Sequence, residues 1–424
     1  MRRFCFIVGL FFSSSLLFSQ QLSERKLGRQ LKKIPQLANA FVGISVLSLE
    51  EHKEVAAYNA SNYFTPASNT KLLTFLGAVQ TFSKLPALEY AIENDSIAHF
   101  KSTGYPLLFH PFYPDTVLQN SFQNQQTWIY HPAKTAPNLL GLGWSWDDYS
   151  YYYAAPSSVF PIYGNTVQGI IKENSPQFIP SFPASPDSRV TNLQRSLSEN
   201  TFLYNPQNWS SEDTLYRPFL PNDPLFVKLL GKALDKKVIL DTTTGDSFPW
   251  QKLITEQDPL LYKGLLHDSD NGIAEALLLM IAHEKAGVFR PEVAIDSLKE
   301  QWKYWLPDPL EWVDGSGVSR YNMFTPRTLV AVLQQLKQKL SWEVLSAYMP
   351  QGGATGTLKA YPDLVNVYAK TGTLRHNHNL SGYWVNANGK HYAFSILVNH
   401  FTTPTAEVRQ GISELLLWMQ RKAK

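Results

Sequence analysis

The stretch FTPASNTKLLTF, residues 64–75, predicts a loop that turns directly into a helix. Proline is favoured at the start of a helix, and apolar side chains follow at helical spacing, at Leu72, Leu73, Phe75, Leu76 and Val79. Ser68 therefore lies in the first turn, and Lys71 emerges on the same face one turn later. Because a neutral amine can take the proton of a serine hydroxyl, this spacing makes Ser68 a candidate nucleophile and Lys71 its candidate base.

The Ser-x-x-Lys spacing is a weak signal when it stands alone. It also occurs at Ser23 and Lys26, and a capping serine with a solvated lysine is its ordinary meaning. Lys71 can act as a base only if its pKa is lowered, which the positive end of the helix dipole and a second nearby cation would both favour. The significance of the pair therefore depends on whether partner segments occur further along the chain.

A second candidate segment, HDSDN, precedes a strongly apolar helix. Ser269 offers a hydroxyl that can relay a proton, and Asn271 offers an amide that can hold a substrate carbonyl. The alternative is that Ser269 or Asp270 simply caps the helix. Ser-x-Asn is a loose pattern, since it recurs at Ser198 and Asn200, so this segment also gains meaning only from its neighbours in the chain order.

The third candidate segment, YAKTGT, lies in a predicted strand. Gly372 would let a substrate backbone lie close along the strand edge as an added strand. Lys370 would supply a positive charge for a carboxylate and would help to keep Lys71 neutral, and Thr371 can donate to the same carboxylate. Lys-Thr-Gly occurs once in the chain, and three such segments in this order predict one catalytic site.

The predicted elements place the three segments in one split domain. Two strands near the N-terminus, at 41–46 and 55–58, and three near the C-terminus, around 370 and at 380–385 and 392–398, predict an antiparallel sheet with helices on its faces. Between Lys84 and Asp258, prolines, aromatics and turn residues predict a mostly β inserted module. We therefore expect an α+β fold, with residues 21–84 and 259–424 as the catalytic domain and 85–258 as a module of one or two subdomains.

Aromatic side chains crowd the inserted stretch, as in the run from Tyr149 to Tyr153. They could form a carbohydrate-binding platform, but ordinary packing and turns of a β domain are the favoured interpretation.

Residues 1–20 predict a cleaved secretory signal. Two arginines precede an apolar run from Phe4 to Phe18, and Ser19 suits the cleavage position. The alternative, a transmembrane anchor, is disfavoured because a run of roughly fifteen residues is short for a bilayer. Cys5 is the only cysteine, so the mature chain would offer neither a thiolate nucleophile nor a thiolate metal site.

Neither the net charge nor the spacing of the histidines indicates that the protein binds nucleic acid or a metal ion. The net charge of +3 is too small and too dispersed to indicate nucleic acid binding. His376 and His378 could suggest a metal-ligand pair, but their spacing in a predicted loop, without a cysteine or carboxylate motif beside them, favours an ordinary turn. We therefore expect neither a metal nor another cofactor.

The order Ser-x-x-Lys, Ser-Asp-Asn, Lys-Thr-Gly is the signature of penicillin-binding proteins and class A β-lactamases. The chain resembles one branch in particular, the DacB-type D-alanyl-D-alanine carboxypeptidase/endopeptidases, which are class C low-molecular-mass penicillin-binding proteins. The long interval between Ser68 and Ser269 leaves room for the large insertion of that branch. DGSGVSR at 314–320, TPASNTK at 65–71 and GTL at 356–358 also resemble its sequences.

The resemblance implies a split β-lactamase/transpeptidase-like domain and a reaction through an acyl-enzyme. Ser68 would attack the carbonyl between two D-alanines of a peptidoglycan stem peptide, and Lys71 would take its proton. Ser269 would pass a proton to the leaving amine, with Lys370 close enough to tune that relay. Water would then hydrolyse the acyl-enzyme.

The same resemblance assigns the binding groups. Lys370, Thr371 and Thr373 would bind the terminal carboxylate or its neighbours, and Asn271 would orient the substrate. The backbone N–H groups of Ser68 and Thr373 would form the oxyanion hole, whose donors are typically worth ~3 kcal/mol each. A β-lactam, which mimics the D-Ala-D-Ala end, would acylate Ser68.

Several alternatives stay open at this point. Carboxypeptidase and endopeptidase action cut after the same D-alanine, so the sequence favours neither. A β-lactamase is the nearest rival, but the Glu-x-x-x-Asn pattern of class A enzymes is absent between Asn271 and Lys370. A non-catalytic peptidoglycan-binding protein on the same fold is a second rival, which the loss of a catalytic residue would favour, and none is lost.

The N-terminal signal implies a location. We expect secretion across the inner membrane to the periplasm or cell envelope, with no transmembrane anchor after signal cleavage, because no later stretch is long and apolar enough to span a bilayer.

Overall fold

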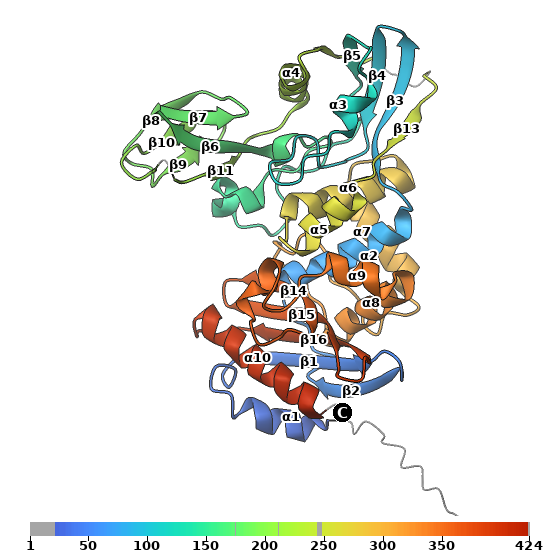
Figure 1. Ribbon diagram of the computed structural model, residues 1–424, viewed down its shortest axis with the longest axis vertical. Coiled ribbons are helices and arrows are strands. Elements are labelled where there is room, and N and C mark those ends of the chain that lie inside the picture. The colour runs from blue at the N-terminus through green and yellow to red at the C-terminus, as the bar shows by residue number, and fades with distance from the viewer. Residues whose placement is uncertain (1–21, 174, 211, 244–247, 423–424) are drawn as a thin grey trace, which may run out of the picture.

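The computed structural model describes residues 22–173, 175–210, 212–243 and 248–422. The predicted secretory signal, residues 1–20, lies outside them. Within these residues, no helix combines the length and the apolar character needed to cross a bilayer. Figure 1 shows a lower part, with one large sheet and most of the helices, and an upper part that holds the other sheets.

The two ends of the chain share one five-stranded sheet, as the sequence predicts. Its strands are antiparallel throughout and lie in the order β14 (Val367–Leu374), β15 (Asn377–Val385), β16 (His391–Asn399), β1 (Phe41–Ser48) and β2 (Lys53–Tyr58). At the junction of the two ends, Phe41 of β1 faces Asn399 of β16. The Lys-Thr-Gly segment thereby lies on β14, at one edge of the sheet.

Helices cover both faces of this sheet (Figure 1). α1 (Glu24–Leu31) and α10 (Thr405–Lys422) pack on one face, and α8 (Pro326–Lys339) packs on the other. Neighbouring residues of β16 show the alternation: Ile396 belongs to one buried cluster with Leu415 of α10, whereas Leu397 belongs to another with Leu333 of α8. The sheet is therefore a buried layer, and only its edges are open.

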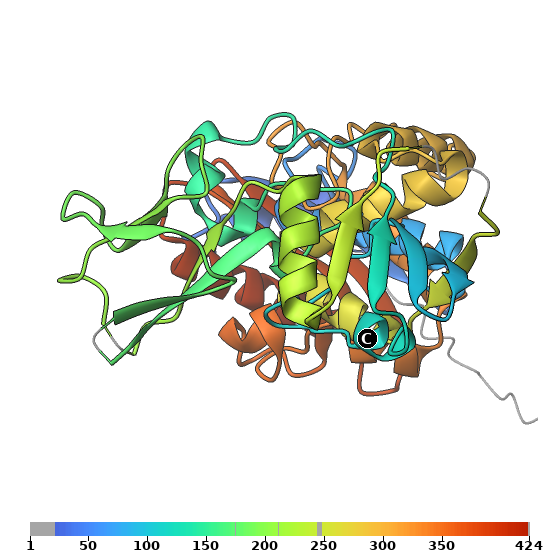
Figure 2. The ribbon, with the colours of Figure 1, turned by 90° about the horizontal axis from the view of Figure 1, so that it is seen from above.

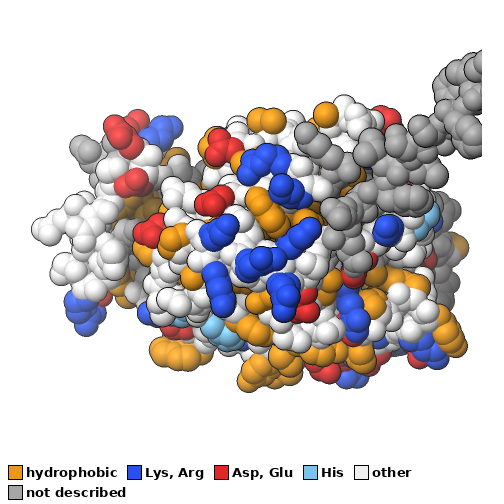
Figure 3. All heavy atoms as spheres, turned by 90° about the horizontal axis from the view of Figure 1, so that it is seen from below, with side chains coloured by type: hydrophobic (Ala, Val, Ile, Leu, Met, Phe, Trp, Pro, Cys, Tyr) orange, Lys and Arg blue, Asp and Glu red, His pale blue; other side chains and the backbone are white. Residues whose placement is uncertain are grey.

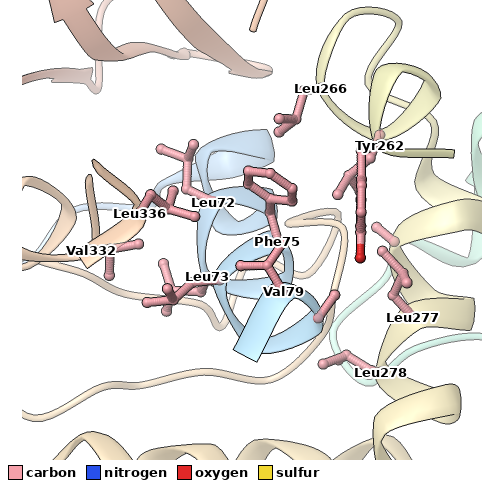
Figure 4. Close-up of a cluster of buried hydrophobic side chains, with 14 of the residues drawn as sticks. Leu72, Leu73, Phe75, Val79, Tyr262, Leu266, Leu277, Leu278, Val332 and Leu336 are labelled. Carbon is pink, nitrogen blue, oxygen red and sulfur yellow. The ribbon is translucent and has the colours of Figure 1, made fainter. Parts of the chain in front are cut away.

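α2 (Lys71–Thr81), the helix that follows Ser68, runs through the centre of the helical layer. Residues 71–79 are all buried, and a helix that is apolar on most sides suits such a position. Figure 4 shows its side chains among those of α5 (Asp258–Leu266), α6 (Asn271–Ala286) and α8; the labelled residues are Leu72, Leu73, Phe75, Val79, Tyr262, Leu266, Leu277, Leu278, Val332 and Leu336. The candidate base therefore starts a helix that is packed from several directions.

Three helices of this layer have no counterpart among the predicted elements. They are α5, α7 (Pro291–Trp302) and α9 (Trp342–Tyr348). α7 packs tightly enough on α2 that a Cβ at Gly77 would lie 2.6 Å from Leu298. The buried residues of α7, at Ala294, Ile295, Leu298 and Trp302, recur at helical spacing, so this helix could have been predicted from the sequence.

The stretch between α2 and α5 is mostly β, as predicted. Its main sheet has the order β12 (Lys237–Leu240), β5 (Thr127–Tyr130), β4 (Ile97–Ser102), β3 (Pro86–Asn94) and β13 (Gln251–Ile254), accompanied by α3 (Val117–Ser121) and α4 (Asp223–Leu234). Two smaller sheets are formed by β6 (Thr166–Lys172), β7 (Ser175–Ile179) and β11 (Leu215–Pro218), and by β8 (Ala184–Pro186), β9 (Leu193–Arg195) and β10 (Phe202–Tyr204). Figure 2 shows these smaller sheets projecting to one side of the molecule.

We propose residues 85–258 as one inserted module, set between the two segments of a catalytic domain at 21–84 and 259–424. Its first and last strands support this division, because β3 and β13 pair with each other: Leu88 faces Leu253, and Tyr90 faces Gln251. A module whose two ends meet in one strand pair can be inserted into a loop without displacing the elements on either side of it.

Folding gathers part of the positive charge on one face, so the charge is less dispersed than the sequence suggests. Figure 3 shows Lys and Arg side chains clustered on the underside of the molecule, where α1 lies. α1 and the residues that follow it contribute five exposed cations: Arg25, Lys26, Arg29, Lys32 and Lys33. This cluster lies at the end of the molecule opposite the inserted module (Figure 1).

Candidate active site

Ser68 lies in a short turn of 3-10 helix, η1 (Ala67–Thr70), that leads into α2. Ala67 has a positive φ of 49°, so the chain bends sharply just before the serine. Asn69 is fully buried and ties the turn to the sheet: its Nδ2 donates to the Lys370 carbonyl at 2.8 Å, and Ser381 donates to its Oδ1 at 2.7 Å. Ser68 itself is only half-buried, so a substrate can reach it.

The Nζ atom of Lys71 has three partners. It lies 2.6 Å from Asn271 Oδ1, 2.7 Å from the Ser316 carbonyl oxygen and 3.0 Å from Ser68 Oγ. The first two can only accept hydrogen bonds, so a neutral amine would donate both of its hydrogens to them and direct its lone pair at the serine hydroxyl. The predicted nucleophile and base are therefore adjacent, in a geometry that suits proton transfer from Ser68 to Lys71.

Burial lowers the pKa of Lys71 to about 8, although the nearby carboxylates of Asp314, Glu275 and Asp270 act to raise it. Desolvation is therefore the main cause, and not the helix dipole or the second cation that the sequence suggested. Burial and the neighbouring Lys71 also lower the pKa of Lys370 well below its usual range. A substrate carboxylate placed beside Lys370 would favour its charged form again.

The Ser316 carbonyl belongs to a loop, residues 314–319. The sequence drew attention to this loop only because DGSGVSR resembles sequences of the DacB-type branch. The buried carboxylate of Asp314 organises this loop by accepting hydrogen bonds of 2.6–2.8 Å from the amides of Gly317 and Ser319 and the side chains of Asn322 and Trp144. Every residue type has a backbone carbonyl, so the sequence could not reveal that the Ser316 carbonyl accepts from Lys71.

The same loop packs directly on the nucleophile turn. Gly317 has a φ of +82°, and a Cβ there would overlap the carbonyl oxygen of Ala67. From the other side, Glu275 of α6 accepts from the amides of Gly315 and Ser316 at 3.1 and 2.8 Å. Burial and the charge of Asp314 raise the pKa of Glu275 to about 7. The loop is thus fixed between α6 and the turn that carries Ser68.

The residues of the second candidate segment differ in their contacts. Asn271 begins α6 and bonds to Lys71 through Oδ1, so it meets the base as well as facing the site. Asp270 caps the same helix by accepting from the Ile273 amide at 2.9 Å, which is the capping role expected for this position. Ser269 has a positive φ of 62°, and its hydroxyl makes no hydrogen bond to any described residue. The structure therefore brings Asn271 to Lys71 but shows no contact of Ser269 with either lysine.

The inserted module holds the second segment in place, a feature that the sequence did not reveal. The Tyr113 hydroxyl donates to the Asp268 carboxylate, and His110 Nε2 lies 3.5 Å from Asp270 Oδ2. The backbone carbonyl of Tyr153 accepts from Asn271 Nδ2 at 2.7 Å. Three residues around Ser269 are thus positioned by chain that lies more than a hundred residues away, and no local pattern encodes such contacts.

The third segment lies along the exposed edge of the sheet, next to the nucleophile turn. A Cβ at Gly372 would lie 2.5 Å from the Pro66 carbonyl oxygen and 3.0 Å from the Ser68 amide nitrogen, so glycine is required here by the turn itself. The Ala369 amide donates outward to the Pro350 carbonyl at 3.1 Å. Because strand residues alternate, the amides of Thr371 and Thr373 point to the same outer edge, near Ser68.

Side chains of this segment have specific partners. Lys370 Nζ donates to the Thr371 carbonyl at 2.8 Å, and Thr371 Oγ1 lies 2.8 Å from Thr357 Oγ1. Thr373 is exposed, and its hydroxyl lies 2.7 Å from His378 Nδ1. Because strand side chains alternate, Lys370 and Thr373, three residues apart, project from opposite faces of β14.

The prediction of an ordinary turn at His376 and His378 is wrong for His378. His378 lies in β15, where it is only 2% exposed and bonds to Thr373 and Tyr361. His376 lies in the turn and bonds instead to the Phe401 carbonyl at 2.9 Å. The two imidazoles thus have separate partners, and in the described ranges no group of three or more histidine, cysteine or acidic side chains is placed to hold a metal ion.

Comparisons with known proteins agree with this geometry. A model of the D-Ala-D-Ala carboxypeptidase 3 (S13) family matches residues 23–98 and 249–422, which together carry every candidate site residue. D-alanyl-D-alanine carboxypeptidase DacB from Haemophilus influenzae is 23% identical over 429 residues, which cover 89% of this chain and 88% of that protein.

Two solved structures show the same fold. The crystal structure of penicillin-binding protein 4 from Haemophilus influenzae has a TM-score of 0.72 at 21% identity, covering 93% of this chain and 99% of that one. A predatory peptidoglycan endopeptidase from Bdellovibrio bacteriovorus has a TM-score of 0.51 at 14% identity, covering 90% and 93%. Since the family model matches well over half of the residues, the chain belongs to the D-Ala-D-Ala carboxypeptidase 3 (S13) family.

Proposed function

We propose that this chain is a serine D-alanyl-D-alanine carboxypeptidase, endopeptidase or both, acting on peptidoglycan stem peptides through an acyl-enzyme on Ser68. The arrangement of Lys71 carries the proposal. Its buried amine has two fixed acceptors, Asn271 Oδ1 and the Ser316 carbonyl, and Ser68 Oγ as its third partner. Family membership and the activity named for the DacB relative support the substrate class.

In the first half of the reaction, Ser68 Oγ forms a bond to the carbonyl carbon of the penultimate D-alanine, and Lys71 takes the hydroxyl proton. The carbonyl oxygen gains negative charge, which the backbone amides of Ser68 and Thr373 would stabilise. The bond to the leaving D-alanine then breaks, and its amine gains the proton that Lys71 took from Ser68. Ser269 is free of other hydrogen bonds to described residues, so its hydroxyl can relay that proton once substrate is bound.

In the second half, water adds to the ester on Ser68 and gives a proton to Lys71, which passes it to the departing Ser68 Oγ. The acid is released, and the serine hydroxyl is restored. Lys370, Thr371 and Thr373 line the strand edge where the carboxylate of the leaving residue would bind. No group in this scheme needs a cofactor, because the polarising charge and the base are supplied by the chain.

One experiment tests the proposal against its two rivals. The mature protein is incubated with benzylpenicillin and its intact mass is followed. In parallel, release of free D-alanine is measured from a stem pentapeptide, and separation into two stem peptides is measured for a cross-linked dimer. A long-lived adduct on the peptide that contains Ser68, together with D-alanine release or dimer cleavage, is the expected result. Rapid consumption of penicillin would instead indicate a β-lactamase, and a folded protein inert toward all three compounds would indicate a binding protein.

The acylation rate should rise with pH. Lys71 accepts a proton only when it is neutral, and its pKa of about 8 leaves most of the amine protonated at neutral pH. The neutral fraction grows roughly tenfold per pH unit below the pKa, so the second-order rate constant for benzylpenicillin should rise steeply to about pH 8 and then level off. Mass spectrometry of quenched samples gives this constant at each pH. A rate that is flat between about pH 6 and pH 8 would contradict the role of Lys71.

We further propose that the protein works in the cell envelope, outside the inner membrane. The N-terminal pattern of two arginines and an apolar run supports this location, as does a substrate that is part of the wall. N-terminal sequencing of the protein isolated from its host would show whether the chain begins near residue 21.

A further inference from the structure

A buried chain of hydrogen bonds ends at the substrate-binding strand. Thr373 Oγ1 lies 2.7 Å from His378 Nδ1, and His378 Nε2 lies 2.6 Å from the Tyr361 hydroxyl. His378 and Tyr361 are 2% and 1% exposed, whereas Thr373 faces solvent at the strand edge. Nothing in the reaction described above uses His378 or Tyr361.

The Tyr361 end of this hydrogen-bonded series determines which atom is the donor in each of its hydrogen bonds. The Tyr361 hydroxyl is buried, and His378 Nε2 is its only hydrogen-bond partner among the described residues. A buried O–H that fails to donate is destabilising, so Tyr361 donates and Nε2 must be the acceptor. Burial raises the pKa of Tyr361, which keeps its proton in place.

The protonation of His378 follows from the same argument. Burial lowers the pKa of His378 to about 3, so the imidazole is neutral and carries a single N–H at neutral pH. With Nε2 accepting from Tyr361, that proton lies on Nδ1, which donates to Thr373 Oγ1. The Thr373 O–H cannot then point inward, because Nδ1 offers no lone pair. Nδ1–H occupies one of the two lone pairs of Oγ1, and the O–H is left to donate toward the site.

We propose that His378 and Tyr361 are positioning residues that keep the Thr373 O–H turned outward, as a hydrogen-bond donor to the carboxylate of the leaving residue. A carboxylate only accepts hydrogen bonds, whereas a carboxamide also presents N–H groups that need acceptors. A threonine that is free to rotate could serve either group, but one whose O–H is kept turned outward favours the carboxylate. The inference rests on the proposed function and adds to it the source of selectivity for an acidic substrate end.

Tyr361→Phe tests the proposal because it removes only the inner donor. The imidazole proton is then free to move to Nε2, and Nδ1 can accept from Thr373, which turns the threonine O–H inward. For an Nα,Nε-diacetyl-L-Lys-D-Ala-D-Ala peptide we expect KM to rise about tenfold with kcat little changed, since a hydrogen bond to a charged group is worth roughly 1.5–3 kcal/mol. For the same peptide with a C-terminal carboxamide, kcat/KM should change little.

The deciding quantity is the ratio of kcat/KM for the acid to that for the carboxamide. Thr373→Val should lower this ratio by the same factor as Tyr361→Phe, and the double variant should lose no more than either single one. Tyr383→Phe is the matched control: this residue lies in β15 and is fully buried, and its hydroxyl bonds to the Leu333 carbonyl at 2.6 Å. Its loss should cost stability without moving the ratio.

The tautomer of the wild-type imidazole is a second readout, which depends neither on activity nor on the folding of a variant. Nitrogen NMR of the wild-type protein should show the His378 proton on Nδ1. In a folded Tyr361→Phe variant, the same measurement should show a shift of the proton toward Nε2. A wild-type imidazole protonated on Nε2, or an acid-to-carboxamide ratio that Tyr361→Phe leaves unchanged, would overturn the proposal. If the wild type cleaves neither peptide and resists benzylpenicillin, the proposed function fails, and the tautomer measurement still decides the arrangement of His378.

Discussion

Ser68→Ala should leave the protein folded and unable to form a covalent adduct with benzylpenicillin. The hydroxyl is half-buried and its one hydrogen bond within the described chain is to Lys71, so alanine removes it without opening a cavity. Removing the nucleophile of a serine hydrolase typically costs about 10⁴-fold or more in kcat, because the remaining groups act only through it. Intact mass after incubation with benzylpenicillin, followed by the D-alanine assay, measures both effects.

The chain supplies a control for this substitution. Ser23 stands three residues before Lys26, in the same spacing as the proposed pair, but it lies exposed ahead of α1, and its side chain makes no capping hydrogen bond. Ser23→Ala should therefore keep both the adduct and the hydrolysis. An adduct that persists in Ser68→Ala would place the nucleophile elsewhere and would remove the basis of the proposed mechanism.

Lys71→Met should reduce the acylation rate by about 10³-fold, since a general base contributes typically 10²–10⁴-fold. Methionine fills much the same volume but offers no lone pair to Ser68 and leaves Asn271 Oδ1 and the Ser316 carbonyl without their donor. The rate constant for benzylpenicillin, measured by quenched mass spectrometry, gives the loss directly. Thermal unfolding of the same variant separates it from any loss of stability.

The pH dependence distinguishes a lost base from a disturbed fold. The residual rate of Lys71→Met should no longer rise as the pH approaches about 8, because the titrating amine is gone. Lys26→Met, at the exposed second occurrence of the Ser-x-x-Lys spacing, should keep both the acylation rate and its pH profile. A Lys71→Met variant that retains the rise with pH would assign that titration to another group, of which the buried Lys370 is the first candidate.

Local spacing made part of the site predictable from sequence. Ser68 and Lys71 are separated by one helical turn, so their contact follows from the helix alone. Lys370 could be placed beside them only because three short segments occurred together in a known order. The sheet was predictable for a similar reason, because five apolar runs at the two ends of the chain needed partners and had only one another.

The features of the site that the sequence could not show depend on backbone atoms and on contacts between residues far apart in the sequence. The Ser316 carbonyl is an acceptor that any residue type would supply, so its role is invisible until the loop around Asp314 is folded. The contact of Tyr113 with Asp268 joins two segments with no shared pattern. His378 was misjudged because strand β15 begins earlier than the turn residues suggested, which moved the imidazole from a loop into the core.

The pairing of the two chain ends also determines when the site can first exist. Asn69, next to the nucleophile, bonds to the carbonyl of Lys370, 301 residues further along, and Phe41 pairs with Asn399, so the turn is held by strands that are synthesised long after it. Contacts so distant in sequence form late in folding, because a long loop must close first. A chain still being synthesised therefore carries Ser68 and Lys71 without their fixed partners, and it gains reactivity only when strands β14 to β16 have been released from the ribosome.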